Sequence, residues 1–409
     1  MQRGFEAIDS TEKMDSASAV LKVLHIAPTP FFADRGCHIR IRGLVCALNR
    51  LGIENVVCTY HHGRDVAGVE TRRIGAIPKF TSTDAGPNRS KYLADLKLLF
   101  LAVREIRRLR PDIVHGHLHE GALIGWLARV VAMRWRTPLV ADIQGSLVGE
   151  LRTFNYFSNS RWLYRVFWGI EYVILRLPKH LFCSSPTSKS LLLGDFRIDP
   201  QKVTQVDDAV DADIFARVRN TGTKPPLPSD TITVIYSGSL LPGKGVVELC
   251  EALRELLAHR DDIRVLLIGY PVDTVHSLMG QAAQDERITL MGRVAYDELP
   301  QHLVAADIAL EPKNADSGEG SGKVIHYMAA GLPIVCFDTR NNRALMGDIG
   351  FYAKRGSIEE FVAQIELLAD DVELRRRHGE AGAIQAKETL SWEQGGKLIS
   401  AIYCKFARI

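Results

Sequence analysis

The sequence predicts an α/β protein made of two parallel-sheet domains that face a cleft. Short runs of β-forming residues alternate with amphipathic helical stretches between residues 22 and 206, and the same alternation begins again at residue 233. Such alternation is typical of parallel sheets that are covered by helices on both faces. A polar, proline-rich segment, 216–230, separates the two series and is interpreted as a linker. Two domains of this kind usually bind a ligand between them, at the carboxyl ends of the strands.

The first series follows a leader at 1–20 and occupies residues 21–215. Its first helical run ends at Gly52, and glycine is a common helix stop. The expected strands are 22–27, 55–60, 113–117, 138–143, 180–185 and 203–206, and the expected helices are 37–52, 92–112 and 120–133.

The second series occupies residues 231–390 and repeats the pattern. The expected strands are 233–238, 263–269, 288–292, 307–312 and 333–337, with helices at 246–258 and 298–306. A last helical stretch, 391–409, is expected to pack back across the cleft onto the first domain.

The composition is that of an ordinary globular protein, with 46% hydrophobic and 24% charged residues among 409. A net charge of +3 argues against nucleic-acid binding. The seven cysteines are scattered and form no C-x-x-C pair, which indicates buried free thiols in a reducing cytosol. No stretch of about 18 apolar residues is present, so no transmembrane helix is expected. Residues 1–20 carry acids and no apolar core, and we expect a disordered leader rather than a signal peptide.

Basic and aromatic residues gather in the first half of the chain. The segments 104–112 and 129–137 are basic, and 155–182 is rich in aromatic residues, arginine and lysine. With the amphipathic stretch 89–110, they indicate either helices with one buried and one solvated face or a surface for anionic lipid. The second interpretation predicts a cytoplasmic protein that attaches peripherally to the inner face of the cytoplasmic membrane.

Two loops of the first domain carry candidate functional residues. Gly36 stands just before a helix, where backbone N–H groups can approach a phosphate or a sugar hydroxyl, although a plain turn explains it as well. The run "HGHLHEG" (115–121) holds three histidines and a glutamate. His115 and His117 alternate on a strand without a supporting Cys or Asp cluster, so we expect a hydrogen-bonded or ligand-facing histidine and no metal.

Two loops of the second domain each place a lysine at a helix start. Lys244 follows a glycine-rich turn in "SGSLLPGKGVVEL", which suggests a diphosphate site or a surface turn. The G-x-x-x-x-G-K-S/T loop for nucleoside triphosphates is absent. In "SGEGSGKVIHYMAAGLPIV" (317–335), Lys323 opposes the helix dipole, so it needs a negative partner. Either Glu319 or a bound phosphate supplies that charge.

These motifs resemble those of family 4 glycosyltransferases, which are retaining enzymes of the GT-B fold with two Rossmann-like domains. The phrase "HYMAAGLPIV" is similar to the family's E-(A/Y)-M-A-x-G-x-P-V-V signature, and "VIYSGSLLPGKGVVELCEAL" resembles the start of its donor domain. The resemblance spans roughly residues 21–400. It implies metal-independent transfer of a sugar from a nucleotide-diphosphate sugar to an acceptor hydroxyl, with the acceptor in the first domain and the nucleotide sugar in the second. No cofactor is implied.

The resemblance also implies roles for single residues. Lys244 would bind the diphosphate, Arg293 and Val294 would lie near the nucleobase, and His117 and Glu319 would be catalytic residues beside the reacting sugar. The implied donor-binding residues are Gly36, Gly238, Ser239, Lys244, Arg293, Val294, Glu319, Ser321, Gly322, Lys323 and His326. The implied acceptor-binding residues are Arg35, His38 and Gln144.

Several positions depart from the family pattern. His326 stands where the family has a second glutamate that holds the ribose, and Glu319 is seven rather than eight residues before it. Ser239 replaces the usual arginine and Asp208 the usual asparagine. The donor is expected to be UDP- or GDP-linked and the acceptor a lipid-linked or membrane-associated glycan precursor. A sugar-nucleotide 2-epimerase and a degenerate, non-catalytic nucleotide-sugar-binding protein are the alternatives.

Overall fold

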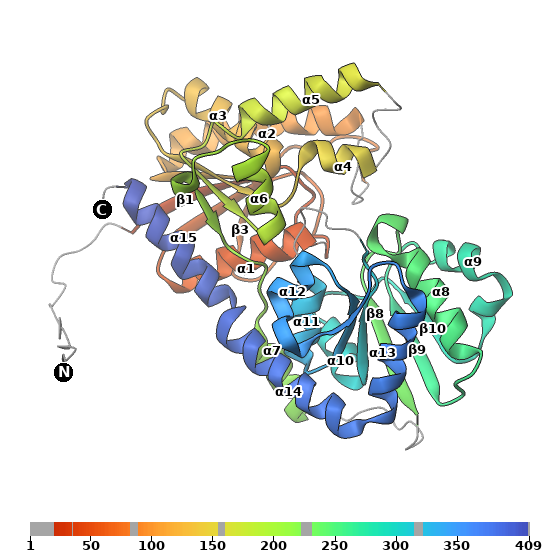
Figure 1. Ribbon diagram of the computed structural model, residues 1–409. Coiled ribbons are helices and arrows are strands. Elements are labelled where there is room, and N and C mark those ends of the chain that lie inside the picture. The colour runs from red at the N-terminus through yellow and green to blue at the C-terminus, as the bar shows by residue number, and fades with distance from the viewer. Residues whose placement is uncertain are drawn as a thin grey trace, which may run out of the picture.

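The computed structural model describes residues 20–34, 36–81, 89–153, 160–221, 231–314 and 322–407. Two sheets, each flanked by helices, form two α/β domains that lie side by side (Figure 1). All strand pairs in both sheets are parallel. The predicted fold class, two Rossmann-like parallel-sheet domains, is therefore confirmed. Most of the expected leader lies outside the described residues.

The first sheet has seven strands in the order β3-β2-β1-β4-β5-β6-β7. The strands are β1 (Lys22–Ala27), β2 (Glu54–Thr59), β3 (Glu70–Arg73), β4 (Ile113–His117), β5 (Leu139–Ile143), β6 (His180–Cys183) and β7 (Val203–Gln205). Its helices are α1 (Gly36–Arg50), α2 (Arg89–Leu109), α3 (Leu118–Val131), α4 (Leu147–Thr153), α5 (Arg161–Ile174) and α6 (Pro186–Gly194). The central strands β4 and β5 are buried throughout, as expected for parallel strands covered on both faces.

The second sheet has six strands in the order β10-β9-β8-β11-β12-β13. The strands are β8 (Ile232–Ser237), β9 (Ile263–Ile268), β10 (Ile288–Gly292), β11 (Ile308–Glu311), β12 (Ile334–Phe337) and β13 (Phe351–Ala353). Its helices are α8 (Val246–Leu257), α9 (Asp273–Met279), α10 (Leu299–Ala305), α11 (Gly322–Ala330), α12 (Arg340–Met346), α13 (Ile358–Asp370) and α14 (Val372–Thr389).

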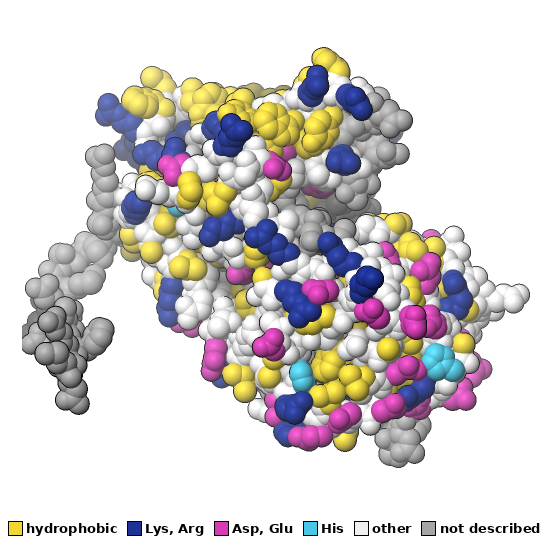
Figure 2. All heavy atoms as spheres, viewed as in Figure 1, with side chains coloured by type: hydrophobic (Ala, Val, Ile, Leu, Met, Phe, Trp, Pro, Cys, Tyr) yellow, Lys and Arg dark blue, Asp and Glu magenta, His cyan; other side chains and the backbone are white. Residues whose placement is uncertain are grey.

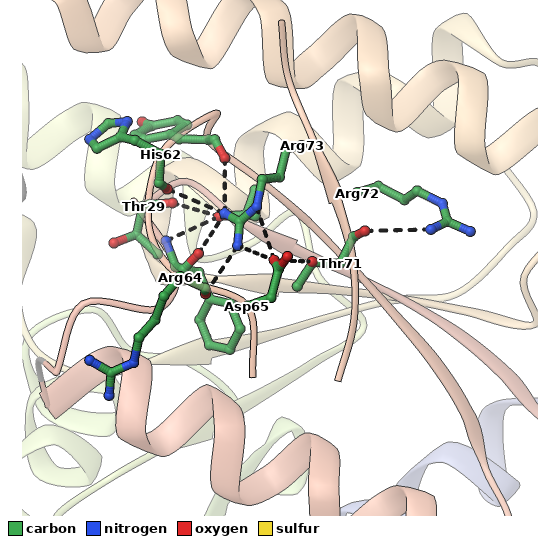
Figure 3. A network of polar contacts seen from close by, with 10 residues as sticks. Thr29, His62, Arg64, Asp65, Thr71, Arg72 and Arg73 are labelled. Carbon is green, nitrogen blue, oxygen red and sulfur yellow. Dashed lines mark hydrogen bonds and ion pairs between the residues drawn. The ribbon is translucent and has the colours of Figure 1, made fainter. Parts of the chain in front are cut away.

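A half-buried arginine on the edge strand β3 anchors the loop between β1 and α1 (Figure 3). The Arg73 guanidinium donates hydrogen bonds to the carbonyl oxygens of Phe31 at 2.6 Å and Arg64 at 3.1 Å, and to the carboxylate of Asp65 at 2.7 Å. The charged sequence of β3 gave no strand pattern, so this strand was not predicted. Its arginine nevertheless fixes the loop that approaches the cleft.

Two helices tie the domains together. Helix α7 (Ala212–Thr221) includes residues 216–221, which were predicted to be irregular linker; they are helical because Phe215 buries its ring in the second domain's core. Helix α15 (Trp392–Ala407) runs back along the first domain (Figure 1). It packs against α1 at Gly43, where an added Cβ would lie 2.2 Å from the Trp392 ring. Among the described residues, no helix is both long and apolar enough to cross a membrane.

Candidate active site

A buried arginine connects three segments at the carboxyl edge of the first sheet. Arg40 on α1 donates two hydrogen bonds of 2.8 Å to the Asp142 carboxylate at the end of β5. Its third nitrogen lies 3.0 Å from Asp208, in the segment that leads to the second domain. Burial alone would raise the pKa of Asp142, but the Arg40 guanidinium holds that pKa well below its usual range. The cluster fixes where the chain crosses between domains.

His117 lies in a chain of buried, hydrogen-bonded side chains next to this cluster. The side-chain amide of Asn55 donates to Asn49 and to the Ile53 carbonyl, so its oxygen accepts from His25 Nε2 at 2.9 Å. Burial and the nearby His117 lower the pKa of His25 to about 3, so His25 is neutral and its Nδ1 accepts. His117 Nε2, 3.0 Å away, is therefore the donor. Its Nδ1 faces Asp142 at 3.7 Å.

This chain of side chains also brings together three histidines with the composition of a metal site. One nitrogen from each of His25, His115 and His117 lies within 4.8 Å of the others. The rings are nearly parallel, however, with 19° between His115 and His117 and 15° between His25 and His117. The nitrogens of His25 and His117 point at each other in a hydrogen bond, and not toward a common position where a metal ion could sit. The expectation that no metal is bound here stays a prediction.

Two histidines predicted to touch substrate are buried supports in this structure. His117 is fully buried, and its nitrogens face His25 and Asp142 rather than the cleft. His38, also fully buried, accepts from the Ala33 N–H at 2.9 Å and bonds the Thr29 hydroxyl. His38 thus supports the loop before α1, and its predicted role in acceptor binding stays a prediction.

The two lysine-bearing loops of the second domain lie together at the carboxyl ends of β8 and β11. Gly245, at the start of α8, is so close to the Pro312 carbonyl that an added Cβ would lie 2.3 Å from its oxygen. A Cβ on Gly238 would lie 3.6 Å from the Lys323 side chain. Both glycines also have positive φ angles, which side chains with a Cβ rarely adopt. The predicted donor residues Gly238, Lys323 and Gly322 are thus brought into one region.

Lys323 is paired with an acid that the sequence analysis missed. Its ammonium lies 3.1 Å from the carboxylate of Glu311, which is 1% exposed at the end of β11. The same ammonium donates to the Tyr236 hydroxyl at 3.3 Å and lies 4.5 Å from the centre of that ring. Burial alone would lower the pKa of Lys323, but the adjacent Glu311 raises it, so the lysine is charged.

The remaining diphosphate candidates lie on the two loops that precede α8 and α11. Ser239 is exposed, and its carbonyl accepts from the Tyr236 hydroxyl at 2.9 Å. Lys244 is half-buried in the 3-10 turn Pro242–Lys244, one residue before α8. Glu319 and Ser321 lie outside the described residues, so their predicted roles stay predictions.

His326 is also committed within the protein. Its Nδ1–H donates to the Gly322 carbonyl at 2.6 Å, and its Nε2 accepts from the Tyr296 hydroxyl at 2.9 Å. Burial lowers the pKa of His326, which agrees with a neutral ring that donates at one nitrogen and accepts at the other. Both nitrogens of His326 therefore have partners within the protein, and its predicted role in donor binding stays a prediction.

The proposed nucleobase residues, Arg293 and Val294, directly follow β10, next to Tyr270 in the loop after β9. The Arg293 guanidinium lies 4.3 Å from the ring centre of Tyr270, whose side chain is about half exposed. Val294 packs against the apolar core of the second domain. Tyr270 adds an exposed aromatic surface that was not among the predicted residues.

The first domain closes over this side of the second domain. Asp34 accepts a hydrogen bond of 3.1 Å from the backbone N–H of Tyr296, and Arg42 lies 2.9 Å from Asp297. Phe32 packs its ring against Tyr296. Gly36 begins α1 in open space next to this contact, whereas Arg35 lies outside the described residues.

The predicted acceptor residue Gln144 belongs to the buried cluster. Its side-chain amide donates to Asp142 at 3.1 Å. Just beyond it, Glu171 of α5 accepts from the backbone N–H groups of Leu147 and Val148 at 3.0 Å each, at the start of α4. The loop after β5 is thereby held from both sides.

Two family models match successive parts of this chain. The glycosyl transferase 4-like domain matches residues 35–209, and the glycosyl transferases group 1 domain matches residues 219–385. The chain belongs to the group 1 glycosyltransferases. Its two matched regions correspond to the two observed sheets.

Similar proteins support this assignment at low identity. The sulfoquinovosyl transferase SQD2 of Arabidopsis thaliana is 23% identical, over 90% of this chain and 70% of its own. A GDP-mannose-dependent monoacylated alpha-(1-6)-phosphatidylinositol monomannoside mannosyltransferase of Corynebacterium glutamicum is 27% identical, over 57% of this chain and 60% of its own.

Solved glycosyltransferases show the same fold. The sucrose-phosphate synthase of Thermosynechococcus elongatus superposes with a TM-score of 0.78 at 17% identity, over 95% of this chain and 100% of its own. Anabaena Alr3699/HepE, in complex with UDP and glucose, gives 0.69 at 15% identity, over 94% and 100%. This glycosyltransferase therefore has the GT-B fold.

Proposed function

We propose that this glycosyltransferase moves a sugar with retention from a UDP- or GDP-linked donor to an acceptor hydroxyl, without a metal ion. The observation that carries the proposal is the convergence of two lysine-bearing loops at the carboxyl ends of β8 and β11. That edge is where open parallel sheets bind nucleotides. The helix starts there offer backbone N–H groups to an anion.

The leaving nucleoside diphosphate gains negative charge as its bond to the sugar breaks. Lys244 and the start of α11 would stabilise this charge, because preorganised donors act strongly in a water-poor cleft. Lys323 contributes less than its charge suggests, since Glu311 already compensates for much of it. Glu319 would lie beside the transferred sugar.

Retention rests on the family resemblance. The anomeric carbon loses its bond to the phosphate oxygen and gains one to the acceptor oxygen on the same face. The acceptor proton passes to the leaving phosphate. His117 would act through Asp142, as a support for the loop after β5, because its nitrogens lie below the cleft in this structure.

For the acceptor, we propose a lipid-linked or membrane-associated glycan precursor. The Corynebacterium relative is named for a phosphatidylinositol mannoside acceptor, and the first domain carries the exposed apolar face described below. Peripheral attachment at the inner face of the cytoplasmic membrane follows from the same reasoning.

A thermal-shift panel of UDP, GDP, ADP and their sugars tests the donor. A ligand at about 100 times its dissociation constant adds roughly 2.7 kcal/mol of stability. We expect Lys244→Ala to abolish the shift and Lys387→Ala, an exposed lysine on α14, to leave it unchanged. Absence of a shift with every nucleotide would rule out the proposed donor site.

Product analysis separates the alternatives. A 2-epimerase would convert the donor sugar to its epimer with no acceptor present, and a degenerate binding protein would show a thermal shift but no turnover. We expect slow donor hydrolysis without acceptor and an α- or β-linkage identical to that of the donor with acceptor.

A further inference from the structure

One face of the first domain exposes many large apolar side chains. On α2, Tyr92, Leu96 and Phe100 follow each other at four-residue spacing, and they are 69%, 49% and 64% exposed. Residues four apart lie on one side of a helix. Among the described residues, 13 of the 22 large apolar side chains that are exposed lie between Tyr92 and Val173.

The same face continues over two neighbouring helices. At the end of α3, Met133 is 83% and Trp135 62% exposed, and on α5 Trp162 is 72% exposed. Figure 2 shows hydrophobic side chains gathered over the α2–α3–α5 side of the molecule, whereas acidic side chains concentrate on the second domain. A continuous apolar surface of this kind marks an interaction site.

The charge of this face is positive. Helix α2 exposes Arg104, Arg107 and Arg108, and α5 exposes Arg161 and Arg165. The acids of these two helices are half-buried or fully buried, and they are Asp95, Glu105 and Glu171. Glu105 pairs with both Arg104 and Arg108, so one carboxylate faces two guanidinium groups and the charge balance of α2 at this face stays positive. Exposed arginines beside apolar side chains are typical of helices that lie on anionic lipid.

The three helices form a preformed surface. Arg107 of α2 donates to the Val131 carbonyl at the end of α3 at 2.8 Å. Glu171 of α5 is buried and lies 3.2 Å from His119 in the first turn of α3. The same carboxylate caps α4, at the loop that carries Gln144. Because the helices are already ordered, binding at this face costs little conformational entropy. The face also lies one helix away from the proposed acceptor loop.

We propose that the α2–α3–α5 face seats on an anionic lipid bilayer, with the second domain turned toward the solvent. Figure 1 places these helices on the side of the first domain away from the second. A second copy of this chain is a poorer occupant, because an isologous contact sets arginines against arginines. The membrane contact itself does not depend on the proposed function. Only the suggestion that it brings a lipid-linked acceptor to the site rests on that function.

Flotation of the full chain with vesicles tests the proposal. Vesicles of phosphatidylcholine with phosphatidylglycerol should carry the protein upward at low salt, and pure phosphatidylcholine vesicles should carry much less. Arg161→Gln with Arg165→Gln should lower the partition coefficient about 25-fold, since each basic residue near the surface contributes roughly fivefold. Phe100→Ser with Trp162→Ser should lower it at least about tenfold.

Matched controls lie on α14 of the second domain. Val372→Ser with Ile384→Ser changes two apolar side chains that are 69% and 58% exposed, and it should leave flotation unchanged. Protein that stays at the bottom with anionic vesicles overturns the proposal, as does equal loss in the control variant. A dimer in sedimentation velocity that Phe100→Ser with Trp162→Ser dissociates would assign the face to a second copy instead.

The nucleotide thermal shift separates this inference from the proposed function. Variants of the α2–α3–α5 face should keep the shift of the parent protein. If the protein floats but shows no thermal shift with any nucleotide, the membrane surface is supported and the donor site is rejected. If nucleotides shift the melting temperature but the protein does not float, the donor site is supported and the membrane surface is rejected.

Discussion

The buried pair of Lys323 and Glu311 leads to a sharp test of how the donor site is built. Glu311→Gln keeps the shape of the side chain but removes the charge that compensates Lys323. The ammonium is left with the Tyr236 hydroxyl at 3.3 Å and its ring at 4.5 Å. Neither contact carries a full negative charge, so together they replace only part of the stabilisation that the 3.1 Å ion pair with Glu311 gives Lys323.

The magnitude follows from the burial of the pair. Removing one partner of a buried ion pair costs about 3–5 kcal/mol. Lys323 keeps 18% of its side chain exposed and retains Tyr236, so we expect a loss of about 2–3 kcal/mol for Glu311→Gln. Adding Lys323→Met removes the uncompensated charge, and the double variant should recover at least half of that loss.

Urea unfolding followed by tryptophan fluorescence measures these changes. Glu373→Gln, which alters a surface ion pair on α14, is the control and should leave the stability nearly unchanged, because solvent screens an exposed pair. The reasoning is refuted if Glu311→Gln is as stable as the parent, or if the double variant is no more stable than the single one. UDP or GDP should also stabilise Glu311→Gln more than the parent, because the freed ammonium can meet the diphosphate.

Three further outcomes follow from the buried groups. His25 has a folded pKa of about 3 against an ordinary value of 6.5, so the native state binds fewer protons than the unfolded state below pH 6.5 and His25 lowers stability as the pH falls. Its share of the stability lost between pH 7 and pH 5 is about 2 kcal/mol, and His25→Asn should reduce that loss by this amount in urea titrations. His326→Leu should cost about 1–2 kcal/mol by leaving the Tyr296 hydroxyl without its acceptor, with His326→Gln losing about half as much in thermal denaturation. Asp208→Asn should tighten UDP or GDP binding about tenfold in calorimetry, because it removes a carboxylate at the start of α11; weaker binding would contradict this placement.

The fold could be read from the sequence because its signals are local. Alternating apolar strands and amphipathic helices, with glycine stops, appear in the printed order of the chain. The misses have non-local causes. Strand β3 is charged and exists because it pairs with β2, and residues 216–221 are helical because Phe215 finds a pocket in the distant second domain.

The sequence predicted where the site lies in the fold, but it predicted less well which residues pair with the charged and polar side chains of the site. The helix start at Lys323 did require a negative group, as expected, but the structure supplies Glu311 from the preceding strand. Nothing in the loop sequence pointed to it, although an acid that ends a buried strand just before a proposed anion site is a usable signal. The sequence also could not show the internal partners of His38 and His326, which are the Ala33 N–H and the Gly322 carbonyl.

The charges around the cleft constrain how a donor can enter. Arg40 is satisfied by Asp142 and Asp208, and Lys323 by Glu311. A nucleoside diphosphate that reaches the start of α11 meets Asp208, whose carboxylate lies 3.6 Å from the position of a Cβ on Gly322. Burial raises the pKa of Asp208, so it can take up a proton more readily than an exposed aspartate. Donor binding should therefore be coupled either to protonation of Asp208 or to its movement with the interdomain segment, which links the chemistry of the site to the relative position of the two domains.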